Sequence, residues 1–425
     1  HFYETILPEF VGEEETLRIG RERGYGGDVK NIGKWTGYYY WIWPDRPTLR
    51  PWVATNHPTE DLFVMERNPY YWKVDPEGNQ LPYIDRIVTE KVGQDQSKLK
   101  QLAGEIDLAV IEVQDVPLFM DNAENGDYRL VQWRGTSGSQ VGFAINQTVE
   151  DPKLRPLFRD VNFRAGLSHA LDREEINSIV WDGMLEPRQA SIARGLANYS
   201  EEWENRFVEY DPELAAQYFD EAGLVWDDDE EWRTFADGSE LTIVVTLQDS
   251  PTPARVAELA KDYWAQAGIN VVVNVVDANY EHELRYGNKL QIGVEGLGVF
   301  NIALRPDVLV PLRVLQGWSG HYGLWRATDG EQGIEPTQPV KDILTYWDNL
   351  VASTNWDDIS MWADRIVDVH TEQVYVIGVA GEAPIFNLVT NRFRNFPPDM
   401  IRCDEMRNYS VANPSTFFIV PEPDA

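Results

Sequence analysis

The side chains that could do chemistry are scattered along this sequence rather than gathered into a catalytic motif. Residues 227–231 (DDDEE) lack the spacing and the glycine of an EF-hand calcium loop, so an ordinary solvated loop is expected there. The sequence contains no HExxH motif, phosphate-binding loop, GxSxG motif or dinucleotide fingerprint. We therefore expect no catalytic residues, no metal site and no cofactor. The histidines show no paired metal-ligand spacing; they are His1, His57, His169, His282, His321 and His370.

Paired carboxylates leave one kind of chemistry open. Glycoside hydrolysis needs two carboxyl groups that face each other across a cleft. With 70 Asp and Glu residues the chain offers many pairs, and none stands out by its sequence context. A secreted carbohydrate-active hydrolase is therefore kept as an alternative, although we expect the protein not to be an enzyme.

Aromatic side chains are the more informative group. The chain has 16 Trp and 19 Tyr, and 12% of its residues are Phe, Trp or Tyr. Such rings suit ligand walls and the faces of sugars, with core packing as the alternative. Trp264 and Trp347 lie on helix faces, which favours packing. Trp133, Trp318 and Trp325 lie in loop contexts, where α/β proteins place ligands, and for these three both roles stay open.

Length and charge limit the class of protein. At 425 residues the chain exceeds one ordinary hydrophobic core, so two or more lobes are expected. A net charge of −33 argues against nucleic acid or an anionic membrane surface as partner, because both require a basic face. The acidity fits a saline setting or simply reflects lineage, and both stay open. The single cysteine, Cys403, excludes an internal disulfide and any multi-cysteine metal site.

The elements that would position these side chains form alternating strands and helices. Asp211 is a helix N-cap followed by Pro212 at the first helical position. Residues 241–247 and 269–276 are apolar, β-branched runs on either side of an amphipathic helix over 252–267. Such a strand–helix–strand unit predicts two parallel strands in a sheet that helices cover. Further strands are expected at 290–295 and 375–379, and further helices at 340–350 and 358–370.

Five motifs stand in register along the chain. Each is weak alone, but together they cover most of residues 60 to 280. They are 66–88 (ERNPYYWKVDPEGNQLPYIDRIV), 98–109 (KLKQLAGEIDLA), 143–146 (FAIN), 158–173 (FRDVNFRAGLSHALDR) and 210–223 (YDPELAAQYFDEAG). In this order they resemble the family 5 extracytoplasmic solute-binding proteins of ABC importers, the receptors for peptides, nickel and oligosaccharides.

The resemblance implies an α/β, two-lobed fold of the type II periplasmic-binding-protein kind. Lobe I would hold residues 1–166 and 394–425, and lobe II would hold residues 167–393. The family's members begin with a further subdomain before the segment that matches His1, so we expect lobe I to be incomplete at the N-terminus. An incomplete lobe I would expose a sheet edge or an apolar face.

The resemblance also bears on the ligand. Peptide receptors of the family anchor the ligand's amino group on an Asp, and the matching position here falls near Phe300, where no Asp stands. Standard peptide recognition is therefore not expected. The run 305–311 (RPDVLVP) and the loop 318–325 (WSGHYGLW) resemble the oligosaccharide-type branch. In that branch Glu295, Asn301 and Arg305 could supply hydrogen bonds, with a role as hinge or surface groups as the alternative.

We therefore expect a monomeric, periplasmic or otherwise extracytoplasmic receptor that closes on an oligosaccharide, less readily a peptide, and delivers it to the membrane subunits of an ABC importer. A relative that acts as a peptide chaperone or sensor is a further alternative. Tyr280 joins the candidates because it follows the strand at 271–276, and strand ends border ligand clefts. The candidate ligand-binding residues are Trp133, Tyr280, Glu295, Asn301, Trp318, Tyr322 and Trp325.

Overall fold

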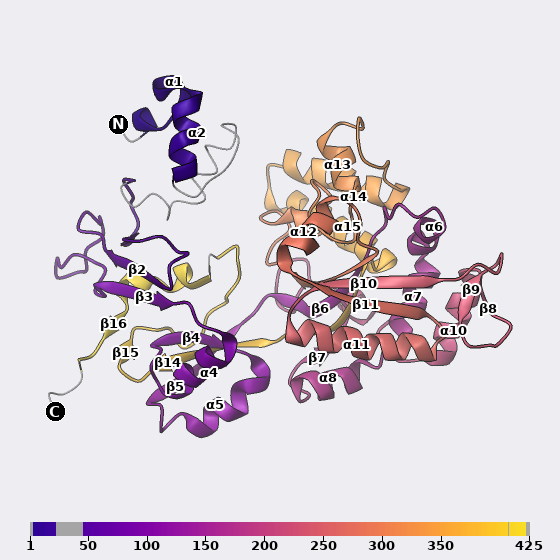
Figure 1. Cartoon of the computed structure of the whole chain (residues 1–425), viewed down its shortest axis with the longest axis horizontal. Coiled ribbons are helices and arrows are strands. Elements are labelled where there is room, and N and C mark those ends of the chain that lie inside the picture. Colours follow the sequence, from indigo (N-terminus) through magenta and orange to yellow (C-terminus); the bar gives the residue numbers. More distant parts are fainter. Residues whose placement is uncertain (1–2, 23–45, 407, 422–425) are drawn as a thin grey trace.

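The computed structural model describes residues 3–22, 46–406 and 408–421. The glycine-rich residues 24–27 and Pro44, for which the sequence favours loops, lie outside the described residues. The described chain forms two lobes, which lie side by side in Figure 1. In that view the strands β2 to β5 mark lobe I, and the strands β6 and β10 mark lobe II.

Lobe II is built on a six-stranded sheet with the order β11-β10-β12-β6-β13-β7. A separate hairpin pairs β8 (Leu224–Trp226) with β9 (Arg233–Phe235). The six strands are β6 (Ser137–Ile145), β7 (Glu186–Pro187), β10 (Thr242–Gln248), β11 (Asn270–Val276), β12 (Ile292–Gly298) and β13 (Val376–Gly381).

The predicted strand–helix–strand unit is confirmed. Strands β10 and β11 are parallel neighbours in register from Thr242 opposite Asn270 to Gln248 opposite Val276. The helix between them, α11 (Pro251–Gln266), buries Val256, Ala260 and Trp264 against the sheet. Trp264 is fully buried, as its place on a helix face predicted. The α/β reading of this part of the chain therefore holds.

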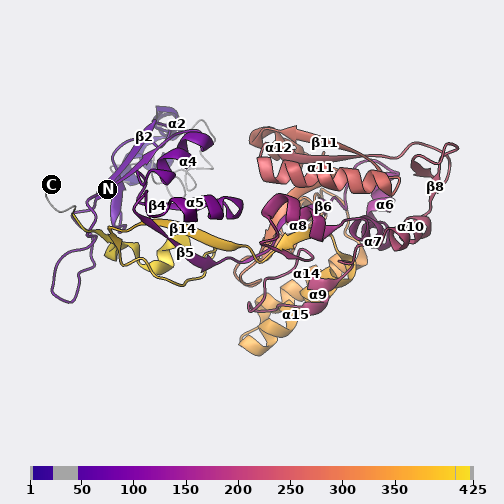
Figure 2. The same ribbon diagram turned by 90° about the horizontal axis from the view of Figure 1, so that it is seen from below.

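Helices cover both faces of the lobe II sheet, because its strands alternate their side chains between two cores. In β6, Phe143 and Ile145 enter one core while Ala144 enters the other. Figure 2 shows α11 on one side of the lobe and α14 and α15 on the other. The helices are α6 (Leu154–Arg159), α7 (Val161–His169), α8 (Arg173–Trp181), α9 (Glu201–Asn205), α10 (Pro212–Glu221), α12 (Ala278–Tyr286), α13 (Tyr322–Ala327), α14 (Gln338–Ala352) and α15 (Trp356–Gln373).

Lobe I contains smaller antiparallel sheets in the orders β1-β2-β3, β4-β14-β5 and β15-β16. The edge strand β3 is largely exposed, and Val88 on it is 52% exposed. Strands of lobe I are β1 (Trp52–Ala54), β2 (Leu62–Arg67), β3 (Arg86–Glu90), β4 (Leu108–Ile111), β5 (Tyr128–Arg134), β14 (Pro384–Thr390), β15 (Phe393–Arg394) and β16 (Phe418–Ile419). Its helices are α1 (Pro8–Val11), α2 (Glu13–Glu22), α4 (Gln94–Leu102) and α5 (Val116–Asn122).

The lobe boundaries expected at 166/167 and 393/394 are wrong. Strand β6 already belongs to the lobe II sheet, where it pairs with β12 and β13. Strand β14 pairs with β4 and β5, so the chain has returned to lobe I by Pro384. The chain therefore crosses between the lobes at residues 135–136 and 382–383, and lobe II spans 137–381.

Glycines let the backbone pack closely beside these crossovers. A Cβ on Gly138 would lie 1.5 Å from the Ser191 oxygen, and one on Gly381 would lie 2.0 Å from the Gly138 oxygen. On β13, a Cβ on Gly378 would lie 2.1 Å from the Ala190 nitrogen. Backbone atoms cannot move aside as a flexible side chain can, so only glycine fits at these positions.

We predict that Gly378→Ala lowers the free energy of unfolding by about 1–3 kcal/mol, because the new methyl group overpacks the contact with Ala190. Gly293→Ala is the matched control, because Gly293 lies in β12 of the same sheet and a Cβ there meets Leu290 at an ordinary contact distance of 3.5 Å. It should stay within about 0.5 kcal/mol of the parent. Urea unfolding followed by circular dichroism measures both. Equal stability of the two variants would refute the close packing of β13.

Candidate ligand site between the lobes

A cavity of about 540 Å³ lies between the two lobes. Lobe I contributes α4, the end of β4, the 3-10 turn η4 (Val113–Asp115) and Phe119 of α5. Lobe II contributes Gln140 and Val141 of β6 and residues 250–253 at the start of α11. Strand β10 is parallel to both of its neighbours, β11 and β12. Since α11 follows β10, residues 250–253 lie at the carboxyl end of this strand. Ligands of α/β proteins bind at such strand ends.

The cavity lining is rich in amide and hydroxyl groups. Gln94, Gln101 and Gln114 come from lobe I and Gln140 comes from lobe II. An amide both donates and accepts hydrogen bonds, so these side chains can match the hydroxyl groups of a neutral polar ligand. Among the lining residues in the described chain, Phe119 alone is aromatic. The cavity is therefore less dominated by rings than the sequence suggested.

The cation in the cavity wall is already paired. The Lys98 ammonium lies 2.7 Å from Oδ2 of Asp115, and both residues line the cavity. A paired lysine offers little net charge to an anionic ligand. The lining also carries the carboxylates of Asp95 and Glu112. The wall therefore disfavours an anionic ligand, and its amides suit a ligand that forms hydrogen bonds.

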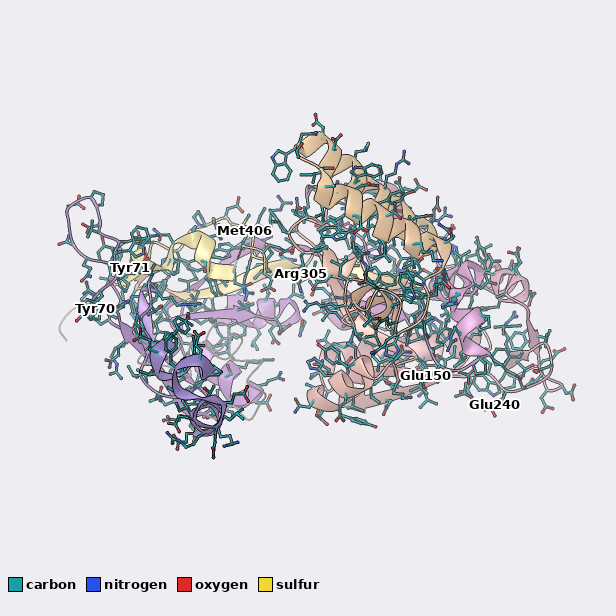
Figure 3. The ribbon with its side chains drawn as sticks, turned by 90° about the horizontal axis from the view of Figure 1, so that it is seen from above. Tyr70, Tyr71, Glu150, Glu240, Arg305 and Met406 are labelled. Carbon is teal, nitrogen blue, oxygen red and sulfur yellow. The ribbon has the colours of Figure 1, made fainter. Side chains whose placement is uncertain are left out.

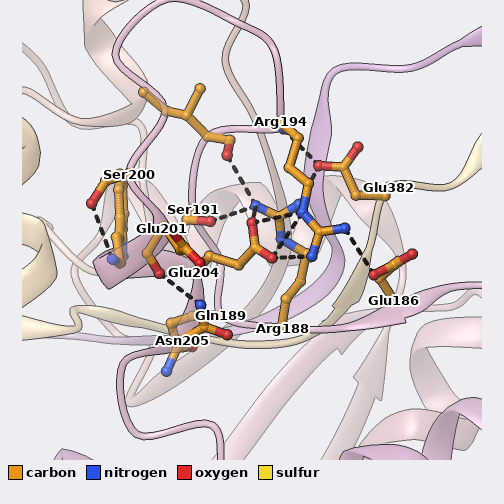
Figure 4. Close-up of polar contacts among 12 residues, drawn as sticks. Glu186, Arg188, Gln189, Ser191, Arg194, Ser200, Glu201, Glu204, Asn205 and Glu382 are labelled. Atoms are coloured by element: carbon orange, nitrogen blue, oxygen red, sulfur yellow. Dashed lines mark hydrogen bonds and ion pairs between the residues drawn. The ribbon is translucent and has the colours of Figure 1, made fainter.

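A network of ion pairs holds lobe II against the second crossover (Figure 4). The fully buried Arg188 pairs with Glu204 at 3.1 Å and with Glu382, which is part of that crossover. Arg194 also pairs with Glu204, and its backbone N–H donates to Glu382 at 2.7 Å. Arg188 further donates to the Ser191 hydroxyl at 2.7 Å. The crossover is thus tied to the segment that precedes α9.

The charge of Glu204 is stabilised despite its burial. Burial opposes ionisation, but the hydrogen bonds from Arg194 and Tyr199 and the charge of Arg188 outweigh it, so the pKa of Glu204 lies below its usual value. Glu204 therefore stays ionised and, together with Glu382, balances the charges of the two guanidinium groups. A buried arginine without such a partner would be strongly destabilising.

Three of the expected ligand-binding rings lie inside hydrophobic cores. Trp133 is fully buried in lobe I, where its ring stacks on Phe396 at 4.7 Å and its Nε1 donates to the Pro397 oxygen. Trp318 and Tyr322 are at most 1% exposed in lobe II. The Trp318 ring stacks on Tyr375 at 4.6 Å. The expectation that these rings wall a cleft is corrected here, because packing hides their faces from any ligand.

Tyr280 and Trp325 keep some exposure. Tyr280 is 48% exposed and lies in the first turn of α12, whose N-cap Asp277 accepts hydrogen bonds from the backbone of Asn279 and Tyr280. It stands at the carboxyl end of β11, as predicted, but outside the residues that line the cavity. Trp325 is partly buried and packs against the lobe II core. Ligand contact by either residue stays a prediction.

Glu295 and Asn301 have partners within lobe II. The Glu295 carboxylate pairs with Arg285 at 2.5 Å and accepts a hydrogen bond from the Gly317 backbone. The Asn301 side chain accepts from the Ala303 N–H at 2.9 Å and so forms a turn just after β12. Both side chains thus organise the carboxyl end of β12, and their contact with a ligand is untested.

The glutamines of α4, η4 and β6 were missed by the sequence analysis. Their signal is weak, because glutamine is common on exposed helices and loops. The segment 250–253 carried a usable signal, since it directly follows the strand predicted at 241–247. The same strand-end argument that selected Tyr280 would have selected Ser250 and Thr252.

Two features are absent from the part of the chain that the structure describes. Groups of three or more His, Cys, Asp or Glu side chains that could hold a metal ion do not occur there. Within the same residues, none of the helices combines the length and the apolar character needed to cross a membrane.

Comparison with known proteins identifies relatives of one kind. Residues 48–307 match the family described as bacterial extracellular solute-binding proteins, family 5 Middle. A periplasmic alpha-galactoside-binding protein of Rhizobium meliloti is 24% identical over 419 residues, which are 94% of this chain and 56% of the relative. The chain thus spans little more than half the length of this curated relative.

Solved structures agree on the fold. An oligopeptide-binding protein OppA superposes with a TM-score of 0.68 at 30% identity, covering 99% of this chain and 70% of the other. The periplasmic binding protein MelB of Agrobacterium fabrum C58, solved in complex with stachyose, gives a TM-score of 0.71 at 22% identity and covers 88% and 57%. The two-lobed periplasmic-binding-protein fold expected from the sequence is confirmed.

The core that holds Trp318 predicts a pH dependence of stability. His370 is buried against Trp318, Trp203 and Tyr375, and its Nε2 lies 2.8 Å from the Leu309 oxygen. Burial lowers the pKa of His370 to about 4, against about 6.5 in the unfolded chain. As the pH falls, the unfolded state therefore binds the proton first. The contribution of His370 to the free energy of unfolding is complete above pH 6.5 and decreases by about 3 kcal/mol as the pH drops to 4.

Urea unfolding at a series of pH values between 7.5 and 4 measures this loss. His370→Gln is the control, because it cannot titrate in this range, so the difference between the two curves isolates His370 from the carboxylates. Parallel curves for the parent and the variant would show that His370 does not carry the predicted dependence.

Proposed function

Because the chain belongs to family 5 of the bacterial extracellular solute-binding proteins, we propose that it binds a neutral oligosaccharide between its lobes and passes it to an ABC importer. The lobes close on the ligand by bending at the two crossovers. The protein acts outside the cytoplasm as a monomer, and the membrane subunits of the importer are its partners. The ligand is released unchanged, without covalent chemistry.

One observation carries the proposal. The cavity of about 540 Å³ takes its walls from both lobes, so a bound ligand bridges them. Its volume lies within the roughly 300–1,000 Å³ typical of small-molecule sites. Amides on both walls can bond to the hydroxyl groups of a sugar, and the paired Lys98 adds no free cation.

The relatives suggest the sugar class. One is named as an alpha-galactoside-binding protein, and a structural neighbour holds stachyose. We therefore propose an alpha-galactoside oligosaccharide as the ligand. An oligopeptide is the second candidate, because the structural neighbour at 30% identity is named as an oligopeptide-binding protein. Against it, the position near Phe300 carries no Asp to hold a peptide's amino group.

We predict that stachyose raises the melting temperature of the protein and that Gln101→Ala weakens stachyose binding several-fold. Loss of one hydrogen bond to the ligand costs about 0.5–1.5 kcal/mol. Gln96→Ala is the matched control, because Gln96 lies on the same helix, is exposed and does not line the cavity. Isothermal titration calorimetry measures both affinities, and a thermal-shift assay measures the stabilisation.

Tri-alanine and unmodified stachyose serve as further probes in the same assays. Tight binding of tri-alanine with no response to stachyose would replace the oligosaccharide by a peptide. Release of galactose from stachyose, detected by chromatography after long incubation, would favour the hydrolase alternative. Equal losses in Gln96→Ala and Gln101→Ala would move the site away from the cavity.

A further inference from the structure

Noncovalent contacts also join the lobes. Beside the first crossover, the Arg134 guanidinium of lobe I donates to the Arg194 oxygen of lobe II at 3.0 Å. Near its C-terminal end the chain lies in lobe I, but residues 404–405 reach a loop of lobe II that follows β12. Figure 3 labels Arg305 and Met406 on the facing sides of the two lobes. These contacts are a hydrogen bond and an ion pair. They can therefore break while the chain stays intact.

On the lobe I side this segment is held by backbone hydrogen bonds. The Arg134 N–H donates to the Met400 oxygen and the Arg402 N–H donates to the Arg134 oxygen, both at 2.9 Å. Residue 134 is the last residue of β5, directly before the first crossover. The segment therefore starts at the hinge and moves with lobe I.

On the lobe II side two acidic residues make the contacts. The Phe300 N–H donates to Oε1 of Glu405 at 3.1 Å. The Arg305 guanidinium lies 3.6 Å from Oδ2 of Asp404, with both side chains partly exposed. The lobe II loop that donates these contacts is held in place by Asn301. The Asn301 side chain accepts from the Ala303 N–H, and its backbone oxygen accepts from Leu304 and Arg305.

These contacts depend on the angle between the lobes. A hydrogen bond that exists in one arrangement and is lost when the lobes part adds stability to the first arrangement alone. The bond to Phe300 is charge-assisted, which makes it stronger than a bond between neutral groups. The Asp404–Arg305 pair is longer and more exposed, so it adds less.

We propose that Asp404 and Glu405 form a carboxylate latch that holds the two lobes together and so raises the population that is competent to bind ligand. The effect on affinity rests on the proposed function, whereas the effect on lobe separation does not. The apparent affinity for ligand rises in proportion to the fraction of the protein that is in the binding-competent state.

The test measures lobe separation without ligand. Small-angle X-ray scattering compares the parent with Glu405→Ala, Glu405→Gln and Asp399→Ala. Glu405→Ala should increase the radius of gyration. Glu405→Gln should lie closer to the parent, because its amide oxygen still accepts from Phe300. Asp399→Ala should match the parent, since Asp399 is exposed on the same segment and takes no part in the latch.

Arg305→Ala removes the Asp404 contact from the lobe II side and should increase the radius of gyration less than Glu405→Ala does. It carries the test if Glu405→Ala fails to fold in a thermal-unfolding check. A radius of gyration in Glu405→Ala equal to that of Asp399→Ala overturns the latch. So does an expansion of the same size in Glu405→Gln as in Glu405→Ala, because the hydrogen bond would then not be responsible.

Stachyose affinity separates the two proposals. With a working latch, Glu405→Ala should bind stachyose about three- to tenfold more weakly than Asp399→Ala. If the parent does not bind stachyose at all, the proposed ligand is wrong, and the scattering result still decides the latch. Expansion of Glu405→Ala with unchanged stachyose affinity overturns the link between lobe separation and binding.

Discussion

The buried guanidinium of Arg188 is the interaction on which the arrangement of the lobes depends. It is fully buried and pairs with Glu204 inside lobe II and with Glu382 in the second crossover. A buried charge that loses one partner costs several kcal/mol, so these groups are held together strongly. The lobe II end of the second crossover, at Glu382, is therefore held in place. Motion between the lobes must be taken up by the few residues that remain, 135–136 and 383, and by contacts that can break.

The close packing around Gly138, Gly378 and Gly381 reinforces this constraint. Each of these glycines lies against backbone atoms of a neighbouring segment, which leaves no room for a side chain. The part of the lobe II sheet beside the hinge, in strands β6 and β13, is thus closely packed. Rigid bodies joined by short flexible segments are the requirement for hinge closure. The same rigidity sets the cavity walls, because β6 carries both Gly138 and the cavity residue Gln140.

Local sequence signals predicted the elements of lobe II well, because each signal acts within a few residues. Asp211 caps α10 through its side chain, and the runs around α11 form the parallel pair β10 and β11. The lobe boundaries could not be read in this way. Only Gly135 and Thr136 separate strands β5 and β6, so the sequence looks continuous where the chain changes lobes.

The candidate site was predicted less well than the fold. Trp318 and Tyr322 stand in a glycine-rich run that reads as a surface loop, yet this run folds back onto a core formed with His370 and Tyr375. Whether a loop ring packs or binds depends on residues distant in sequence, which no local pattern records. The strand-end argument depends on topology. It places Tyr280 after β11, outside the residues that line the cavity, and it applies equally to residues 250–253 in the cavity wall.

The surroundings of Phe300 include a residue that is distant in sequence. In the sequence, the position near Phe300 differs from the peptide receptors because no Asp stands there. In the structure, a carboxylate reaches the Phe300 N–H from the opposite lobe, through Glu405. The negative charge at this place therefore contacts the protein's own backbone. A carboxylate engaged in this way is less available to hold a cationic amine than a free one would be.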